Sequence, residues 1–171
     1  MKSKNILFFS IFLTLISCFN TLSLQAKDKD TSLRSLSIKE RLQFNLGGGI
    51  AIGNTVTNIN VLPQIGYRVT PKFTTGVGAN FQYYRNTFFS PDPFIIYGGN
   101  VFTRYTINPN IFLQAEYQML NFRNIWNEYA LVGGGYSPGS GFYISAYYLV
   151  LYPNNNNIYG APYVIRAGFM F

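Results

Sequence analysis

The chain has 171 residues, enough for one ordinary domain, and combines a low charge content with a high aromatic content. Charged residues make up 11% of it, against roughly 25% in an average soluble domain, while Phe, Tyr and Trp reach 18%. With no His and one Cys, the sequence excludes His-based catalytic triads, His or Cys zinc sites and an internal disulfide framework. Such sparse charge also argues against a nucleic-acid partner.

Residues 1–26 have the features of a secretory signal peptide. Lys2 and Lys4 precede an apolar run at 6–16, which is shorter than the ~20 residues that a membrane-spanning helix needs. We expect cleavage after Ala26, where the sequence becomes strongly charged. The mature chain therefore leaves the cytoplasm.

A second cleavage site remains open. Residues 15–18 resemble a lipobox, in which Cys18 is lipidated and becomes the new N-terminus. In either case, the charge-rich stretch 27–40 is expected to be a disordered periplasmic leader.

Hydrophobic alternation with a period of two begins at residue 41 and predicts strands with two different faces. We expect eight strands of roughly 9–12 residues, the length with which a tilted strand crosses a bilayer. The eight segments are 41–53, 58–69, 73–84, 94–105, 111–120, 128–136, 142–152 and 163–171.

The connections between these segments alternate in length. Tight Pro, Asn and Gly turns are expected at 69–72, 107–110 and 137–140. The other four connections, which belong to the opposite end of the barrel, are 54–57, 85–93, 121–127 and 153–162. The last three of these are expected to be longer loops. Short turns at one end and longer loops at the other predict an all-β, eight-stranded antiparallel up-and-down transmembrane β-barrel over residues 41–171.

The composition of the two faces favours lipid outside the barrel. One face is aliphatic and aromatic, and the other consists of Gly, Asn, Gln, Ser and few ions, whereas a soluble barrel has a charged exterior. A secreted or periplasmic lipocalin-like carrier of an apolar ligand remains the alternative, in which the apolar face would line a cavity.

The stretch 41–171 resembles the family of small outer-membrane β-barrel proteins. Its clearest feature is the C-terminal segment, which is similar to the signal that the barrel-assembly machinery reads. That segment has apolar residues at alternate positions before a final Phe: Tyr163, Ile165, Ala167, Phe169 and Phe171. The resemblance implies a fold, an outer-membrane location and assembly by that machinery, but no specific activity.

Four charged residues on the polar face form the most informative constellation. Glu116 would face into a narrow barrel and needs a cationic partner, since an unpaired buried charge is very unfavourable. We expect a lumen ion-pair network of Arg68, Arg104, Glu116 and Arg166. The alternative is a narrow, weakly anion-selective channel, because arginines outnumber the carboxylate.

Binding at the cell surface would depend on the longer loops. Candidate contact residues are Phe88, Phe89, Arg123, Trp126 and Tyr159. They suit a glycan, a protein or lipopolysaccharide, although the aromatic ones could equally extend the outer aromatic girdle.

We expect no catalysis, cofactor or metal. The known enzymes of this barrel type use a His, and the carboxylates of the barrel (Asp92, Glu116 and Glu128) form no predicted pair. The sequence thus predicts a monomeric, non-enzymatic protein with a structural or surface-binding role.

Overall fold

The computed structural model describes residues 37–171 apart from 53–55, 87–89, 154–157 and 160–161, and the side chains of 50–56 and 86–92 also lie outside the description. The predicted signal peptide, Cys18 and most of the leader therefore lie outside the described residues, as do Phe88 and Phe89. No described helix is long and apolar enough to cross a membrane.

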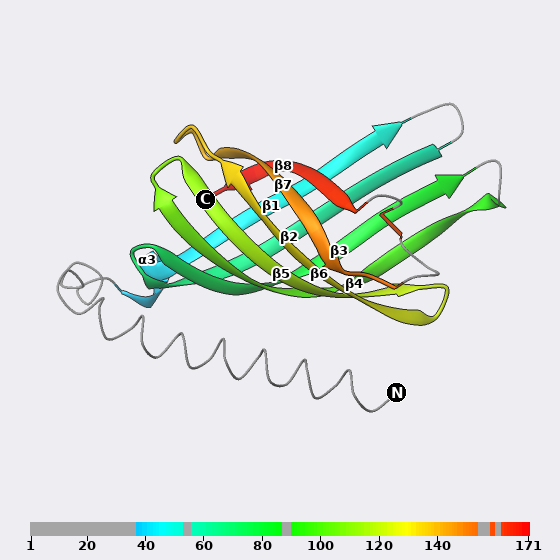
Figure 1. The fold of residues 1–171 in the computed structure, drawn as a ribbon, viewed down its shortest axis with the longest axis horizontal. Coiled ribbons are helices and arrows are strands. Elements are labelled where there is room, and N and C mark those ends of the chain that lie inside the picture. Colours follow the sequence, from blue (N-terminus) through cyan, green and yellow to red (C-terminus); the bar gives the residue numbers. More distant parts are fainter. Residues whose placement is uncertain (1–36, 53–55, 87–89, 154–157, 160–161) are drawn as a thin grey trace. The chain divides into compact units, whose positions relative to one another are not determined.

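Eight antiparallel strands form one closed barrel, in which each strand pairs with its neighbours in the sequence and β1 pairs with β8 (Figure 1). The elements are α3 (Ile38–Arg41), β1 (Leu42–Ile52), β2 (Val56–Thr70), β3 (Phe73–Asn86), β4 (Ser90–Asn108), β5 (Ile111–Phe122), β6 (Ile125–Tyr136), β7 (Phe142–Leu151) and β8 (Tyr163–Met170). The predicted all-β, eight-stranded antiparallel barrel is confirmed.

The tight turns at one end follow local side-chain chemistry. Asn108 accepts hydrogen bonds through its side-chain oxygen from the backbone N–H groups of Asn110 and Ile111, at 3.0 and 2.8 Å. Thr70 does the same for Phe73 at 3.0 Å. Such Asx- and Ser/Thr-type turns reverse a chain within a few residues, so the strands on either side are held in register.

The opposite end differs from the sequence prediction at 121–127. This segment is a two-residue hairpin turn and not a longer loop: β5 and β6 stay paired up to Phe122 and Ile125. Arg123 and Asn124 both have positive φ, 53° and 62°, as a turn of type I′ requires. β3 and β4 are likewise paired up to Asn86 and Ser90, so most of 85–93 is strand.

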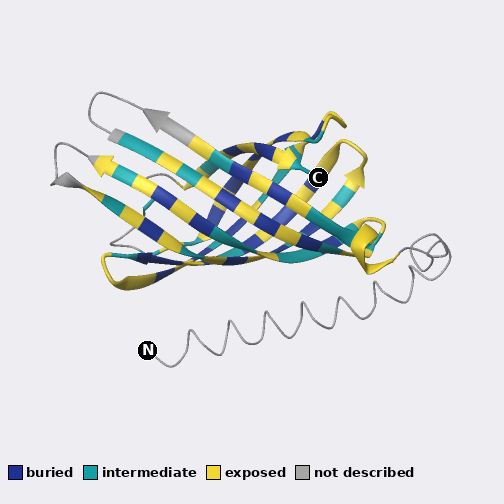
Figure 2. Cartoon of the chain, turned by 180° about the vertical axis from the view of Figure 1, so that it is seen from behind, coloured by how far each residue is buried: buried dark blue, intermediate teal, exposed yellow. Residues whose placement is uncertain are grey.

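Side-chain burial alternates along each strand, as the sequence pattern predicts (Figure 2). On β5, Leu113 is 51% exposed, whereas its neighbour Gln114 is 3% exposed. The outer wall therefore carries aliphatic and aromatic side chains, and most of the polar strand residues point inward.

The interior has two chemically different parts. An apolar cluster fills the side formed by β4 to β7, and Tyr84, Phe122, Ile158, Tyr159 and Val164 pack against it. Its buried members are Ile96, Leu120, Tyr129, Leu131, Tyr147 and Leu149. The remaining buried residues are mainly amides, hydroxyls and ions. Glycine permits close strand approach: a Cβ at Gly133 would overlap the carbonyl oxygen of Ala146 on β7.

Candidate functional site

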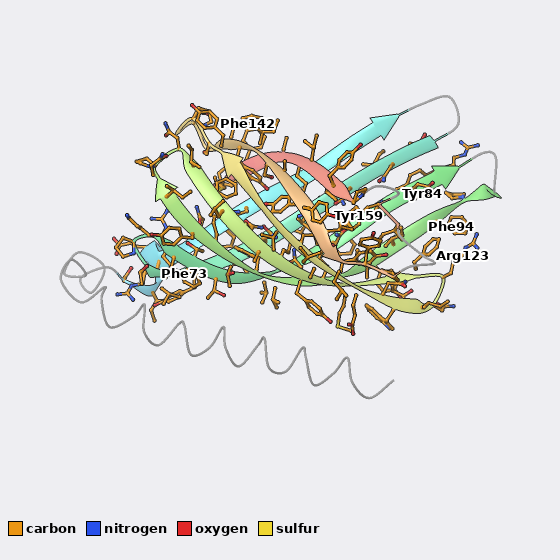
Figure 3. The ribbon with its side chains drawn as sticks, viewed as in Figure 1. Phe73, Tyr84, Phe94, Arg123, Phe142 and Tyr159 are labelled. Carbon is orange, nitrogen blue, oxygen red and sulfur yellow. The ribbon has the colours of Figure 1, made fainter. Side chains whose placement is uncertain are left out.

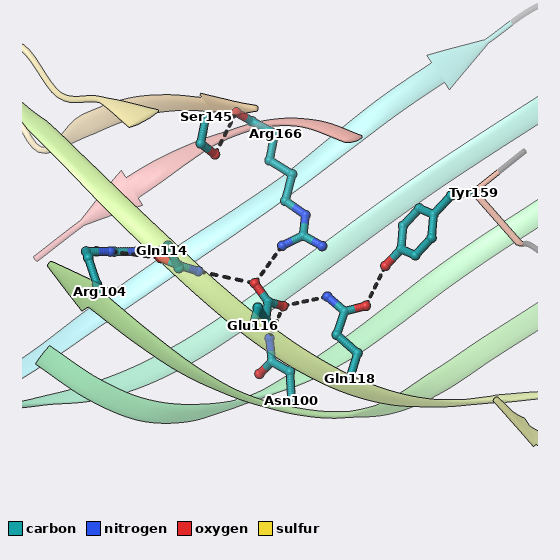
Figure 4. A network of polar contacts seen from close by, with 8 residues as sticks. All are labelled: Asn100, Arg104, Gln114, Glu116, Gln118, Ser145, Tyr159 and Arg166. Atoms are coloured by element: carbon teal, nitrogen blue, oxygen red, sulfur yellow. Dashed lines mark hydrogen bonds and ion pairs between the residues drawn. The ribbon is translucent and has the colours of Figure 1, made fainter. Parts of the chain in front are cut away.

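Glu116 on β5 is the centre of a buried polar network in the lumen (Figure 4). Its side chain is fully buried and accepts hydrogen bonds from four side chains. Arg166 Nη1 lies 2.9 Å from Glu116 Oε2, and Gln114 Nε2 lies 3.2 Å from the same oxygen. Asn100 and Gln118 donate to the other oxygen, Oε1. These four donors satisfy the acceptor sites of the buried carboxylate.

Arg104 on β4 joins this network indirectly. Its Nε donates to Gln114 Oε1 at 2.8 Å, and its Nη1 donates to Asn45 Oδ1 at 3.3 Å. The guanidinium also lies 4.5 Å from the centroid of the Phe112 ring, a cation–π arrangement. Gln114 thus connects Arg104 to Glu116. We call Asn100, Arg104, Gln114, Glu116, Gln118 and Arg166 the lumen network.

Arg68 is not part of the lumen network, contrary to the sequence prediction. It occupies an inward-facing position by alternation, but it is exposed. The reason is its place near the end of β2, where it pairs with Thr74 next to the β2–β3 turn. A long side chain at the mouth of a barrel reaches solvent whichever way the strand alternates.

The buried charges of the interior do not balance. Among the described residues, the buried charged side chains are Arg104, Glu116 and Arg166. Two guanidinium groups thus face one carboxylate, which leaves an excess of one positive charge.

Tyr159 turns inward, and the prediction that it is an exposed loop contact is wrong. Its hydroxyl donates to Gln118 Oε1, and its ring packs edge-to-face on Tyr129 with the centroids 5.3 Å apart. The hydroxyl oxygen of Tyr129 accepts a hydrogen bond from the backbone N–H of Ile158 at 3.4 Å. Burial raises the pKa of the Tyr159 phenol, so the hydroxyl remains a donor.

Replacing Tyr159 by Phe is expected to reduce the free energy of unfolding by about 1–3 kcal/mol, because Gln118 Oε1 would be left buried without its donor. Guanidinium-induced unfolding of the purified protein measures the change. Tyr152→Phe is the matched control, since Tyr152 is exposed just after β7, and it should change stability by less than about 0.5 kcal/mol. Equal effects of the two variants would contradict the role of Tyr159 in the lumen.

Arg123 and Trp126 are exposed, as expected of surface contact residues, but both pack on neighbouring aromatic rings. Arg123 lies 4.2 Å from the centroid of the Phe94 ring, at the end of the barrel opposite Phe73 and Phe142 (Figure 3). Trp126 packs edge-to-face on Tyr97 of the outer wall, with the centroids 6.1 Å apart.

The four residues of the predicted assembly signal all lie on the outer face. The exposed fraction is about half or more for each of them: 65% for Tyr163, 66% for Ile165, 49% for Phe169 and 76% for Phe171. Phe169 also packs edge-to-face on Phe142 of β7, with the centroids 5.8 Å apart.

The amide partners of Glu116 are what sequence reasoning missed. Alternation in the sequence puts Asn100, Gln114 and Gln118 on the inward face, but it does not show that they converge on one carboxylate. Within the described part of the chain, no group of three or more His, Cys, Asp and Glu residues could hold a metal ion.

No protein-family model, curated protein or solved structure matches this chain. The function must therefore be inferred from the barrel's own residues.

Proposed function

We propose that this chain is an integral outer-membrane β-barrel protein with a non-enzymatic role, either structural or in binding at the cell surface. The observation that carries the proposal is the polarity of the wall. Large apolar side chains such as Ile65, Val101 and Leu113 are exposed on the outside, and amides and ions are buried inside. Water penalises so large an apolar surface, whereas hydrocarbon stabilises it.

Closure of the sheet supports the same proposal. Every strand has two paired neighbours, so backbone N–H and C=O groups on the wall are largely satisfied within the barrel. A spanning sheet needs this, because hydrocarbon offers no hydrogen-bond partner.

The lumen supports a structural role over a channel. The lumen network and the apolar cluster both occupy the interior, and eight-stranded barrels are narrow enough for side chains to fill. We therefore expect no conductance in planar bilayers, and a stable ion current would instead support the narrow anion-selective channel.

Surface binding would involve the end that carries Arg123. Arg85 and Arg123 are exposed there, and guanidinium groups bind the phosphates of lipopolysaccharide well. The exposed alternate positions of β8 suit recognition by the barrel-assembly machinery during insertion.

Gel mobility with and without boiling in SDS tests the proposal. We expect the protein in the outer-membrane fraction, and we expect the unboiled sample to migrate differently from the boiled one because a closed spanning barrel resists unheated SDS. A soluble protein without a heat-dependent shift would contradict the proposal and favour the lipocalin-like carrier.

A further inference from the structure

The pairing between β1 and β8, which we call the seam, is the shortest in the barrel. It covers four residue pairs, from Asn45↔Met170 to Gly48↔Ala167. β1 and β2, in contrast, pair from Leu42↔Tyr67 through Ile52↔Thr57. Beyond Gly48, no further β1–β8 pair joins the described residues, and β8 diverges from β1 (Figure 1).

A pocket of about 230 Å³ lies at the point where the seam ends. Its lining includes Gly49, Asn58, Asn60, Gln82, Ile165 and Arg166. Gly49 lies opposite Asn60 on β2, which in turn lies opposite Gln82 on β3. Because Gly49 has no side chain, this inward-facing row leaves a hollow beside Arg166.

The pocket is lined by buried polar atoms that have no partner among the described residues. Arg166 is 4% exposed, its Nη1 binds Glu116, and its guanidinium also interacts with the Tyr159 hydroxyl. Its Nε and Nη2 nevertheless have no acceptor in hydrogen-bond geometry among the described residues. The side-chain oxygens of Asn58, Asn60 and Gln82 are also buried without a donor. Buried polar atoms normally have a hydrogen-bond partner. The convergence of several unpartnered ones on one pocket therefore indicates a ligand site.

The charge of the interior indicates the sign of the ligand. Glu116 pairs directly with Arg166 and connects to Arg104 only through Gln114, so the described interior carries one excess positive charge in total. An anionic group beside Arg166 would balance it, and the carboxamides could donate to the same group after a flip of their N and O atoms.

The size and surroundings of the pocket indicate the rest of the ligand. A volume of about 230 Å³ is below the ~300–1,000 Å³ of pockets that enclose a whole drug-sized molecule. The pocket thus suits a head group, and its outer edge is flanked by the exposed apolar residue Ile165 (66%) and by Tyr163 (65%).

We propose that this seam pocket binds the anionic head group of a single-chain amphiphile, such as a fatty-acid carboxylate. The carboxylate pairs with Arg166, and the alkyl tail leaves between β1 and β8 along the apolar outer wall. The path of the tail rests on the proposed membrane location of the barrel, whereas the head-group site does not.

Binding of radiolabelled laurate to the full-length barrel in phosphatidylcholine vesicles, corrected for protein-free vesicles, tests the proposal. We expect saturable binding at one site. Gly49→Val should weaken it at least about tenfold by filling the hollow. The new Cβ meets nothing closer than the carbonyl oxygen of Ile165 at 3.8 Å, so the barrel should tolerate it.

Gly99→Val is the matched control. Gly99 is exposed on β4, away from the pocket, and a Cβ there first meets the carbonyl oxygen of Gly78 at 3.6 Å. This variant should bind laurate like the wild type. Asn60→Asp, which adds a carboxylate to the pocket without changing its size, should also weaken binding about tenfold.

Three outcomes would overturn the proposal: undiminished laurate binding by both pocket variants, equal binding of dodecylammonium, or equal binding of acetate, which would indicate a site for small soluble carboxylates. The heat-dependent gel shift is measured on each sample. If the wild type lacks the shift, the proposed membrane barrel fails. If the shift is present without laurate binding, only the pocket assignment fails.

Discussion

Replacing Glu116 by Gln is expected to lower the free energy of unfolding by about 3–5 kcal/mol, the range found when one partner of a buried ion pair is removed. The substitution keeps the size of the side chain and removes its charge. Arg166, which is 4% exposed, would then stay buried without a carboxylate. The new amide N–H₂ group would also face donors, since Asn100 and Gln118 both donate to Oε1.

Guanidinium-induced unfolding in lipid vesicles measures this loss, and two further variants interpret it. Glu40→Gln removes an exposed carboxylate from α3, outside the strands, and should change stability by less than about 0.5 kcal/mol. The double variant Glu116→Leu with Arg166→Leu removes the whole pair and should be more stable than Glu116→Gln, because no unpaired charge of the pair remains. A double variant as unstable as the single one would mean that the pair is not the source of the effect.

Replacing Val101 by Arg is expected to destabilise the inserted barrel by about 2–4 kcal/mol, as found for Arg at the lipid-facing midplane of such barrels. Val101 is 53% exposed and lies midway along β4, between Val77 of β3 and Tyr117 of β5. In the proposed location its side chain contacts hydrocarbon, which solvates a guanidinium poorly.

Asn110→Arg is the control for this substitution. Asn110 is exposed in the tight turn between β4 and β5, outside the wall, so the same new charge should change stability by less than about 0.5 kcal/mol. Unfolding in lipid vesicles compares the two variants. If Val101→Arg proves as harmless as Asn110→Arg, the outer wall contacts water and the soluble carrier becomes the better interpretation.

The strands and their facing could be predicted because both depend on local pattern. Alternation placed Leu113 outward and Gln114 and Glu116 inward, as the structure has them. The turn at Asn108 could likewise be predicted from the sequence, because the side chain that stabilises it lies within the turn itself.

The wrong predictions share one cause. Each depended on where a residue lies along the barrel axis, which the alternation of side chains does not encode. Arg68 has the right parity, but it lies at the mouth of the barrel. The segment 121–127 reads as a polar loop, yet strand pairing continues through it to a two-residue turn. Tyr159 lies in an Asn-rich connection that looks exposed, and only its contact with Gln118 places it in the lumen.

The sequence also could not predict which arginine pairs with Glu116. The need for a cation follows from burial, but β5 and β8 are not adjacent strands. Contact between Glu116 and Arg166 therefore crosses the lumen and depends on the diameter of the closed barrel, which no single strand encodes.

The unequal lengths of the strands have a consequence for what the molecule presents to large particles. β3 has 14 residues and stays paired with β4 from Phe73↔Tyr105 to Asn86↔Ser90, whereas β8 has 8 residues. With a rise of about 3.3 Å per residue and a tilt of about 40°, these lengths cover roughly 35 and 20 Å along the barrel axis, against an apolar band of about 25 Å. In the proposed location, the paired strands β3 and β4 would therefore extend about 10 Å beyond the apolar band, whereas β8 would end within it. An antibody or a phage tail approaching the cell would thus meet a rim that is higher on the β3–β4 side than on the β8 side.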